Sequence, residues 1–595
     1  MEKWMMAAKR ADFSAISQKF NVSPVVARIM VNRGLKKDEE FQKFLYGNLN
    51  DLYDPKRMKD LVKGVTLIGD MIRQEKMICI ASDFDVDGVF AGYILWKGIQ
   101  RCGGNAYVEA PDRVLEGYGL NERMIQDAHK KGVSCILTCD NGIAAIQAVK
   151  AAKDLGMNVV VTDHHEVIYR DEMMADGSEK RIYDLPCADA VIDPKQEDCM
   201  YPFKGLCGAG VAYKFIEVLY ETFGIPKEEL YELIPFAAIA TVADVMDLVD
   251  ENRIIVKYGL KALSKTNHLG LKAIMRHSGL NKDTITAYHI GFVIGPCFNA
   301  AGRLDTADMA IRLLQTKNSD VAERLASDLV ELNQSRKEMT LLGYDRAVAM
   351  IEKEGMDKDA VMILCLDGCH ESLVGIIAGR LKEKYHRPVI VGVETEHGIK
   401  ASGRSIEAYN MYEKLNACRE LFLRFGGHAM AAGMTFEKDK LSLLRETLNA
   451  QSGLTKDDLT PVIHIDVPMP IDYISEAFVG ELELLEPFGK GNTKPIFAER
   501  HFQILRASIL GKNRNVLKMQ VKNDAGAKME ALYFGDIEAF DAYVEANYGM
   551  DEKNRMYSGM KNSVDLAFTY YPSVNEYMGR RTLQIIVQNF QKIRR

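Results

Sequence analysis

The segment DFDVDG (Asp83–Gly88) decides how this sequence is interpreted, because it places three aspartates at alternate positions directly after the apolar run MICIA (Met77–Ala81). An apolar run of this length predicts a buried strand. Alternate residues of an extended chain point to the same side, so Asp83, Asp85 and Asp87 are expected to form one group of carboxylates. Such a group stays ionised only at high free-energy cost unless cations are bound. The motif taken alone also fits an N-capping cluster of aspartates in a loop.

Further apolar runs on both sides of this motif predict a parallel sheet. Helix-like stretches, such as Gly88–Arg101 and Asn141–Leu155, alternate with these runs at the spacing of βαβ units. Such units give a parallel sheet covered by helices, and ligands bind at the carboxyl ends of its strands. The expected strands after the first are Ala106–Ala110, Cys135–Thr138, Asn158–Thr162 and Ala190–Asp193.

Acidic and histidine side chains follow two of these later strands as well. Asp140 lies in TCDNG, and the triplet Asp163–His165 lies in VTDHHE, each just past a predicted strand. Asp244, in ATVADVMDL, is a further candidate on or beside a helix. Because the carboxyl ends of parallel strands meet at one edge of a sheet, we expect these side chains to converge there. Asp193, at another strand end, is ranked as a support residue.

The types of these side chains indicate a class of metal. Several carboxylates with one or two imidazoles and no thiolate suit Mn²⁺ or Mg²⁺ better than a zinc site. Two such ions, ~3.5–4 Å apart, can share a bridging carboxylate, activate water and hold a phosphoryl group. The pattern therefore predicts hydrolysis of a phosphoester or phosphoanhydride.

The pattern in the rest of the sequence predicts several further helices and strands. Residues 1 to about 60 are expected to form short helices, and Leu206–Leu263 is helical in pattern. Residues Asp308–Glu354 keep helical spacing without Pro, which predicts a long connecting helix with Gly343 as the candidate break. A second α/β segment and a small β-domain follow. Their expected elements are the strands Ala360–Leu366 and Pro388–Val393 around the helix Leu373–Tyr385, and then the strands Val462–Val467, Phe497–Leu510 and Val516–Val521.

Composition excludes several classes of protein. With 595 residues, 47% of them apolar and 27% charged, the chain has the usage of an ordinary globular protein with several domains. The net charge of −7 disfavours a uniformly basic nucleic-acid binder but allows a local basic channel. No run reaches the ~18 apolar residues of a membrane span. The 11 scattered cysteines, with no CxxC pair, are expected to be reduced thiols, so a cytoplasmic location is expected.

Across its motifs the sequence resembles the DHH phosphoesterase superfamily, named for the triplet found here at Asp163–His165. Within it, the resemblance extends to the 5′→3′ exonucleases specific for single-stranded DNA, and it covers nearly the whole chain. The ordered set of motifs makes it specific: DFDVDG, PDRVLEGYG (Pro111–Gly119), TCDNG, DHH, YPFKGLCGAGVAYK, ATVADVMDL, NAAGRLDTAD (Asn299–Asp308), ASGRS (Ala401–Ser405), FGGHAMAAG (Phe425–Gly433) and EPFGKGNTKPIF (Glu486–Phe497).

The resemblance implies an α/β fold of several domains. Its parts are an N-terminal helical segment (1–60), a DHH catalytic domain with a parallel sheet (61–310), a long connecting helix (311–355), a second α/β, DHH-associated domain (356–455) and a C-terminal β-barrel of the OB-fold type that binds single strands (456–595). A run with six basic and no acidic side chains, Arg500–Lys522, supports a DNA groove on the last part.

The resemblance also implies roles for individual residues. Asp140 is the expected bridging ligand between two Mn²⁺ or Mg²⁺ ions, and Asp163 orients the histidines. His165 is implied either to support the metal ligands from behind them or to contact the scissile phosphate. The implied metal ligands are Asp83, Asp85, Asp87, Asp140, His164 and Asp244, and the implied catalytic residues are Asp87, Asp140, Asp163, His164 and His165.

The substrate residues lie in separate motifs. Arg113, Ser402 and Arg404 are implied to form a pocket for the 5′-terminal phosphate, with Tyr118 stacking near the terminal base. Arg303, after small residues, is placed to reach a backbone phosphate, and His428 lies in a glycine-rich loop on the substrate face of the second domain.

The expected activity is therefore two-metal hydrolysis of single-stranded DNA from the 5′ end, releasing 5′-mononucleotides, in DNA repair and recombination. Alternatives are another DHH-family phosphodiesterase acting on short oligonucleotides, and a catalytically silent replication-fork scaffold. A single-strand-binding protein and a RecQ-type helicase are implied as partners, with no membrane association and a monomeric state.

Overall fold

The chain folds into two compact units. The computed structural model describes residues 2–113, 116–173, 179–281, 285–577 and 579–592, so Val114 and Leu115 of the PDRVLEGYG motif lie outside the described residues. One unit is Leu49–Pro461, and the other combines Met1–Asn48 with Val462–Arg595.

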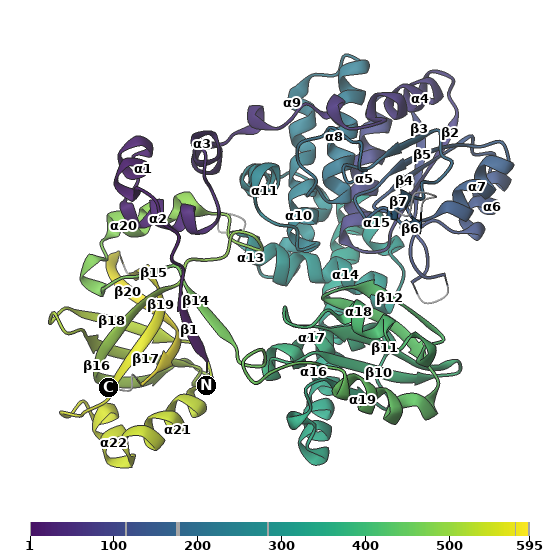
Figure 1. The fold of residues 1–595 in the computed structure, drawn as a ribbon. Helices are drawn as coiled ribbons and strands as arrows, with labels where there is room; N and C mark the ends of the chain where they lie inside the picture. The colour runs from purple at the N-terminus through teal and green to yellow at the C-terminus, as the bar shows by residue number, and fades with distance from the viewer. Residues whose placement is uncertain (1, 114–115, 174–178, 282–284, 578, 593–595) are drawn as a thin grey trace. The chain divides into compact units, whose positions relative to one another are not determined.

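A five-stranded parallel sheet organises the first half of the larger unit. The strand order is β3-β2-β4-β5-β8, and every neighbouring pair is parallel (Figure 1). The five strands expected from the apolar runs are thereby confirmed. Their bounds are β2 Met77–Ser82, β3 Asn105–Glu109, β4 Cys135–Cys139, β5 Asn158–Thr162 and β8 Ala190–Ile192.

Helices cover both faces of this sheet, because alternate strand residues feed two separate apolar cores. Ile78 and Ile80 of β2 pack in one core with helices α4, α5 and α8. Cys79 and Ala81 of the same strand pack in the other core, with α6 and α7. The covering helices are α4 Leu61–Arg73, α5 Val86–Arg101, α6 Glu122–Lys130, α7 Ile146–Asp154 and α8 Gly208–Thr222.

The expected helical segment after the sheet is present, and a buried ion pair ties it together. Lys214 Nζ lies 2.8 Å from Glu251 Oε1, and both side chains are fully buried. The Lys214 ammonium also donates to the backbone oxygen of Tyr53 at 2.8 Å, and the Tyr201 hydroxyl donates to Glu251 at 2.6 Å. The helices are α9 Lys227–Leu230, α10 Ile234–Ala243, α11 Asp250–Leu263, α12 Leu269–His277, α13 Ala287–His289, the π-helical turn η5 Ile290–Ile294, α14 Gly295–Leu304 and α15 Asp308–Gln315.

A single long helix, α16 (Ser319–Glu354), links the parallel sheet region to a second α/β region. The helix expected over Asp308–Glu354 is interrupted just before α16. There the Asn318 side chain caps α16 by accepting hydrogen bonds from the amides of Asp320 and Val321. No break occurs at Gly343, since that residue lies inside α16, where a Cβ atom would sit 2.6 Å from Ile377 Cδ1. The glycine therefore allows close helix packing rather than a bend.

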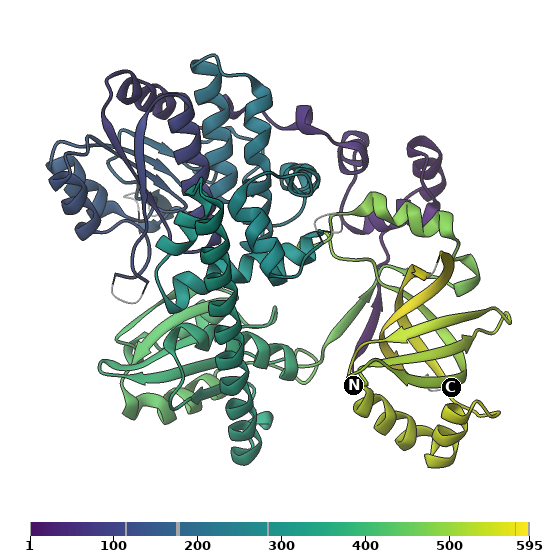
Figure 2. The same ribbon diagram turned by 180° about the vertical axis from the view of Figure 1, so that it is seen from behind.

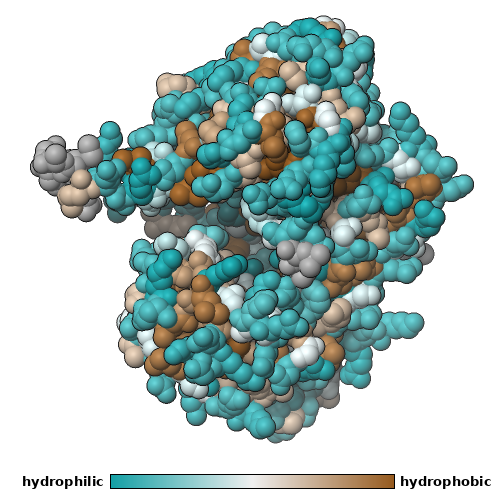
Figure 3. All heavy atoms as spheres, turned by 90° about the vertical axis from the view of Figure 1, so that its right-hand side faces the viewer, coloured by the Kyte–Doolittle hydropathy of each residue, from teal (hydrophilic) through white to brown (hydrophobic). Residues whose placement is uncertain are grey.

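The second α/β region carries a mixed sheet in the order β12-β13-β11-β10-β9. The expected strands and helix are found as β9, β10 and α17, and a hairpin extends the sheet beyond β11. The elements are β9 Met362–Cys365, α17 Val374–Tyr385, β10 Val389–Thr395, β11 Gly398–Arg404, α18 Met411–Asn416, β12 Arg424–His428, β13 Ala431–Phe436 and α19 Leu441–Ala450. Figure 3 shows the surface hollowed between this region and the parallel-sheet region of the same unit.

The smaller unit contains a β-barrel. Strands β16, β17, β18, β20 and β19 follow one another, and pairing of β16 with β19 closes the ring (Figure 2). The N-terminal helices pack into the same apolar core as the barrel. The elements are β1 Lys3–Met6, α1 Phe13–Phe20, α2 Pro24–Asn32, α3 Asp38–Tyr46, β14 Val462–Ile465, β15 Val467–Pro468, α20 Glu476–Leu482, β16 Phe497–Leu510, β17 Val516–Lys522, β18 Lys528–Tyr533, α21 Ile537–Tyr548, α22 Met550–Ser558, β19 Asp565–Tyr577 and β20 Arg580–Gln591.

One antiparallel hairpin, β6 (Tyr169–Met173) with β7 (Glu179–Tyr183), was not expected. Its described side chains are mostly charged and exposed, so it lacks the apolar pattern by which the other strands are found. Within the described residues, no helix combines the length and the apolar character needed to cross a bilayer.

Candidate metal centre and its surroundings

The three aspartates of DFDVDG converge, but not because the chain stays extended. Strand β2 ends at Ser82, and α5 begins at Val86, so Asp83 and Asp85 lie in the connecting turn. Asp85 caps α5, since its Oδ1 accepts a hydrogen bond from the Gly88 amide at 3.1 Å. Asp87 lies in the first helical turn. The capping interpretation of the motif is thus correct for Asp85, and it coexists with the carboxylate cluster.

Asp87 is held by the start of another helix. Its two carboxylate oxygens accept hydrogen bonds from the Gly208 and Ala209 amides of α8, at 2.6 Å and 2.7 Å. Amides at a helix N-terminus have no partner within the helix and favour negative charge. Sequence reasoning missed this interaction, although the glycine-rich stretch GLCGAG, which runs into the first turn of α8, was its signal.

Asp140 follows β4 in a left-handed backbone conformation, with φ of 61°. Non-glycine residues rarely adopt this conformation, and it concentrates at functional sites. The side chain is 3% exposed, and its Oδ1 accepts no hydrogen bond from any described residue. A buried carboxylate oxygen without a donor is what a cation site requires before the cation binds.

The His164 ring lies close to Asp140 and to two further carboxylates. Its Nε2 lies 3.0 Å from Asp140 Oδ1, 3.5 Å from Asp87 Oδ2 and 3.9 Å from Asp244 Oδ2. Asp244 is the C-cap residue of α10, so a helix end delivers this ligand to the edge of the parallel sheet.

Among the described residues, three groups bring potential ligand atoms within 4.8 Å of one another. They are Asp83–Asp85–Asp140, Asp87–His164–Asp244 and Asp140–His164–His165. Asp140 and His164 each belong to two of the groups. The six side chains expected as metal ligands therefore occupy one continuous cluster that offers room for two cations.

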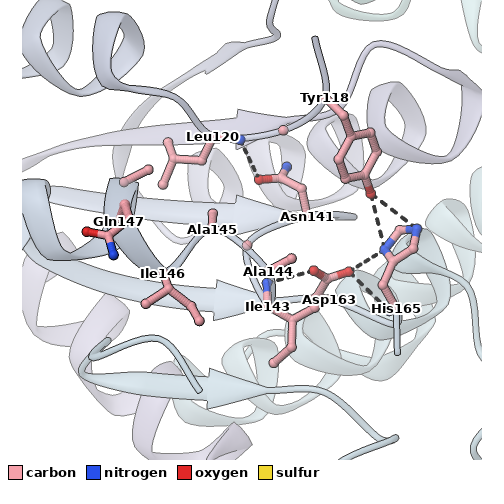
Figure 4. A pocket seen from close by; sticks show the side chains of 13 residues that line it. Tyr118, Leu120, Asn141, Ile143, Ala144, Ala145, Ile146, Gln147, Asp163 and His165 are labelled. Atoms are coloured by element: carbon pink, nitrogen blue, oxygen red, sulfur yellow. Dashed lines mark hydrogen bonds and ion pairs between the residues drawn. The ribbon is translucent and has the colours of Figure 1, made fainter. Parts of the chain in front are cut away.

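The second histidine of the triplet lies in a different hydrogen-bond network (Figure 4). His165 Nδ1 lies 2.7 Å from Asp163 Oδ1, and the other oxygen of Asp163 accepts from the Ile143 amide at 2.9 Å. The Tyr118 hydroxyl donates to the Asp140 backbone oxygen at 2.7 Å and lies 3.2 Å from the His165 ring. Asp163 thus fixes the orientation of His165 beside the carboxylate cluster.

Burial perturbs four carboxylates of the cluster, and repulsion between neighbouring aspartates adds to it for three of them. Burial, followed by the charge of neighbouring aspartates, raises the pKa of Asp83, Asp85 and Asp140, and burial raises the pKa of Asp87. Without cations these groups therefore tend to hold protons. Asp193, which was ranked as a support residue, is also buried, and burial followed by the charge of Asp163 raises its pKa to about 7.

The two histidines shift in opposite directions. Burial, and then the nearby His165, lowers the pKa of His164 to about 4, so His164 presents a neutral ring that is ready to ligate. Burial is the largest influence on His165 and disfavours its charge, but the hydrogen bond with Asp163 and the negative charges of Asp163, Asp87 and Asp244 together raise the pKa of His165 to about 9. His165 is therefore a cation at neutral pH.

A cluster of guanidinium groups lies next to these acids. Burial, and then the positive charge of Arg113, lowers the pKa of Arg303 to about 10, and the same two causes lower the pKa of Arg404. Arg113 also stacks over Phe84 of DFDVDG, with its guanidinium carbon 4.9 Å from the ring centre. Three arginines that repel one another in one place favour the binding of an anion.

The sheet β12-β13-β11 presents polar side chains on one face. The strand register aligns Ser402 with Gly433 and Gly426, and Arg404 with Ala431 and His428. Arg404 Nη1 donates to Ser402 Oγ at 2.8 Å, and Arg303 Nη1, from α14, donates to the Ser372 backbone oxygen at 2.9 Å. Lys400, Thr435 and Arg424 form the next row on this face.

The alternate residues of these strands, among them Ala401, Met434 and Phe425, pack on α18 and α19. Period-2 alternation therefore separates an apolar face from a polar, mostly basic one. Ser402, Arg404 and His428, expected at the substrate, lie on this polar face.

A cavity of about 530 Å³ adjoins the triplet. Tyr118, Asp163 and His165 line one end, and Gly119, Leu120, the loop after β4 and the first turn of α7 line the remainder (Figure 4). The other lining residues are Gly119, Leu120, Asn141, Gly142, Ile143, Ala144, Ala145, Ile146, Gln147 and Ala148.

Three family models match this chain. They are the DHH family N-terminal domain at residues 77–241, the DHHA1 domain at 358–452 and the RecJ OB domain at 465–589. The curated relatives include the single-stranded-DNA-specific exonuclease RecJ of Bacillus subtilis, which is 34% identical over 97% of this chain and 69% of the relative. The protein of the same name from Escherichia coli is 30% identical over 96% of both chains.

Solved structures share the fold. RecJ of Thermus thermophilus, crystallised with Mn²⁺, superposes with a TM-score of 0.79 at 24% identity, covering 100% of this chain and 80% of that one. A second structure, of exonuclease RecJ bound to manganese, has a TM-score of 0.57 at 28% identity and covers 67% of this chain and 96% of that one. The C-terminal barrel is accordingly an OB-fold, and the overall α/β fold of several domains is confirmed.

Proposed function

The chain belongs to the RecJ family of single-stranded-DNA-specific exonucleases, and on that premise we propose how its own residues carry out the reaction. It is a metal-dependent hydrolase that removes nucleotides from single-stranded DNA in the 5′→3′ direction. The observation that carries the mechanism is the convergence of five carboxylates and one imidazole on a single buried cluster.

The residues of the cluster fit two divalent cations, Mn²⁺ or Mg²⁺. Asp83, Asp85 and Asp140 would hold one, and Asp87, His164 and Asp244 the other, with Asp140 shared. The fit rests on the buried Asp140 oxygen that no described donor satisfies and on the oxygen-rich set of ligands. When bound, such a pair supplies an activated water and neutralises charge on the scissile phosphate.

His165 is proposed to act on the phosphate itself. Because its pKa is raised to about 9, it carries a positive charge at neutral pH and can hydrogen-bond a phosphate oxygen. Asp163 holds the ring in place through Nδ1, and the Tyr118 hydroxyl lies 3.2 Å from Nε2, the nitrogen that would face the phosphate.

The 5′ end is proposed to lie in the arginine cluster. Arg113 and Arg404, with Ser402 beside them, offer charged donors that match a terminal phosphate, and Arg303 adds charge while it bonds to Ser372. Tyr118 is proposed to stack near the terminal base, and His428 to contact the strand. A pocket that accepts an end but no internal nucleotide gives the reaction its polarity.

The parts of the chain are proposed to divide the work. Residues 61–310 perform the chemistry, 311–355 connect, 356–455 hold the phosphate end and 456–595 bind the strand, while 1–60 form the N-terminal helical segment. The enzyme is proposed to work as a cytoplasmic monomer, with a single-strand-binding protein and a RecQ-type helicase as partners. The eleven free cysteines support a reducing compartment.

The test is digestion of end-labelled single-stranded DNA in Mn²⁺, with and without a 5′-phosphate. We expect mononucleotides released from the 5′ end, faster from phosphorylated strands. The variant Asp140→Ala should fold but lose cleavage, and cleavage by that variant would refute the shared-ligand assignment. Faster turnover of di- to tetranucleotides than of long strands would instead favour a short-oligonucleotide phosphodiesterase, and absence of Mn²⁺ binding would favour a silent scaffold.

A further inference from the structure

Three consecutive polar side chains at the start of α11 are buried: Glu251 and Asn252 are 0% exposed, and Arg253 is 2% exposed. Burying polar groups is unfavourable unless hydrogen bonds replace those to water. Glu251 is satisfied by the Lys214 cluster described above. Asn252 has a different set of hydrogen-bond partners, which lie in two loops that lead to the metal centre.

The Asn252 amide bridges two loops. Its Nδ2 donates to the backbone oxygen of Gly205 at 2.6 Å and to that of Asp247 at 3.1 Å. Gly205 lies in the loop that enters α8, and Asp247 lies in the loop that leaves α10. A single buried NH₂ group therefore fixes the distance between these two loops.

Each of these loops positions one ligand of the same cation site. The first leads into the Gly208 and Ala209 amides that hold both oxygens of Asp87. The second begins at Asp244, the C-cap residue of α10. Asp87 and Asp244 are the two carboxylates of the group completed by His164.

The backbone of the second loop shows why an external support is needed. Val245, directly after Asp244, has φ of 57°. β-Branched residues are genuine outliers in this region, and such conformations persist only when their surroundings impose them. The hydrogen bond from Asn252 to Asp247 supplies such a constraint two residues further along.

We propose that Asn252 is a positioning residue for the Asp87–His164–Asp244 cation site. The inference rests on the two-cation site proposed above. Asp83 and Asp85 are not carried by the two loops that Asn252 joins, whereas Asp140 packs against Gly208 at the start of α8. Loss of the amide should therefore weaken the Asp87–His164–Asp244 site more than the Asp83–Asp85–Asp140 site.

The experiment is Mn²⁺ titration of the full chain, read by the electron paramagnetic resonance signal of unbound Mn²⁺. Wild-type protein is expected to bind two ions. Asn252→Ala is expected to bind one ion roughly 10–100-fold more weakly, as is typical when a group supporting a metal ligand is removed, and to change the affinity for the other ion by less.

Asn492 provides a matched control in the other unit. It is also buried, and its Nδ2 also donates to two backbone oxygens, those of Leu485 at 2.7 Å and Pro487 at 2.8 Å. Asn492→Ala removes the same chemical groups and should bind both Mn²⁺ ions as wild type does. Weakening of a site in both variants would show a general loss of stability and overturn the proposal.

A second variant keeps the proposal testable if Asn252→Ala does not fold. Asn252→Ser retains one donor, so it can satisfy only one of the two carbonyl groups, and it should weaken binding of the affected Mn²⁺ ion by less than the alanine variant does. Two ions bound at wild-type affinity by a folded Asn252 variant would refute the proposal. Wild-type protein that binds fewer than two ions would instead refute the two-cation site on which the proposal rests.

Discussion

The substitution Gly208→Ala tests whether the start of α8 sets the geometry of the metal centre. A Cβ atom at this position would lie 2.6 Å from Asp140 Cβ and 3.0 Å from Asp140 Oδ1. Non-bonded carbon atoms prefer about 3.5–4.0 Å, so α8 and Asp140 must separate by roughly 1 Å. That movement also stretches the hydrogen bonds from Gly208 and Ala209 to Asp87, which are 2.6 Å and 2.7 Å long.

The expected effects follow from these distances. A displacement of about 1 Å in a catalytic site can cost ~10²-fold in rate. We therefore expect single-turnover cleavage of 5′-phosphorylated single strands to slow by about that factor, and overpacking to destabilise the fold by about 1–3 kcal/mol. Mn²⁺ affinity should fall as well, because Asp140 and Asp87 both move.

The matched control is Gly379→Ala in α17, where no atom lies within 4 Å of the added Cβ. Because alanine favours a helix interior over glycine by ~1 kcal/mol, that variant should be as stable as wild type or more so, with unchanged Mn²⁺ affinity. A folded Gly208→Ala protein with wild-type cleavage rate and Mn²⁺ affinity would refute the argument that this contact positions Asp140.

Three further predictions concern the arginine cluster, pH and the buried ion pair. Arg404→Ala should reduce the preference for 5′-phosphorylated over 5′-hydroxyl strands, measured as a ratio of kcat/KM, by at least about tenfold, since a hydrogen bond to a charged group contributes ~1.5–3 kcal/mol; an unchanged ratio would place the terminal phosphate elsewhere. The pKa values of four carboxyl groups are raised in the metal-free fold, those of Asp83, Asp85, Asp87 and Asp140. The folded protein therefore binds more protons than the unfolded chain. Its stability falls as pH rises above the ordinary carboxyl pKa of ~4. Mn²⁺ should therefore raise Tm more at about pH 8 than at about pH 6, and a pH-independent rise would contradict the shifts. Lys214→Met leaves Glu251 buried without its cation and should destabilise the larger unit by about 3–5 kcal/mol in urea unfolding. Adding Glu251→Leu to this variant should restore much of the lost stability. Equal stability of the single and the double variant would argue against this account.

Local sequence patterns were sufficient to predict the strands and helices that position the site. Each strand of the parallel sheet is a short apolar run bounded by polar turns, so β2, β4 and β5 were found within a residue or two of their ends. The hairpin β6–β7 has no such run, and only its backbone pairing reveals it. The end of α16 was predictable from its periodicity, but the break before Ser319 was not. The role of Gly343 was not predictable either, since it depends on Ile377 in another helix.

The acidic and histidine residues of the centre were also visible in the sequence, because their types and their places after strands are local features. The groups that hold these residues in place are not close to them in sequence. The amides of Gly208 and Ala209 that hold Asp87 come from a helix more than a hundred residues away, and nothing near DFDVDG indicates them. The left-handed backbone of Asp140 likewise has no signature in TCDNG alone.

The grouping of both chain ends in the smaller unit has a consequence for synthesis. Strand β1 pairs in parallel with β14, and helices of the first 48 residues share an apolar core with the barrel that begins beyond residue 462. On the ribosome, residues 1–48 therefore emerge before Leu49–Pro461, whereas the strands that complete their apolar core emerge after it. The larger unit, Leu49–Pro461, is continuous in sequence and can fold in that interval. A nascent chain that stalls just after the larger unit has emerged would thus carry the assembled acidic cluster without the barrel.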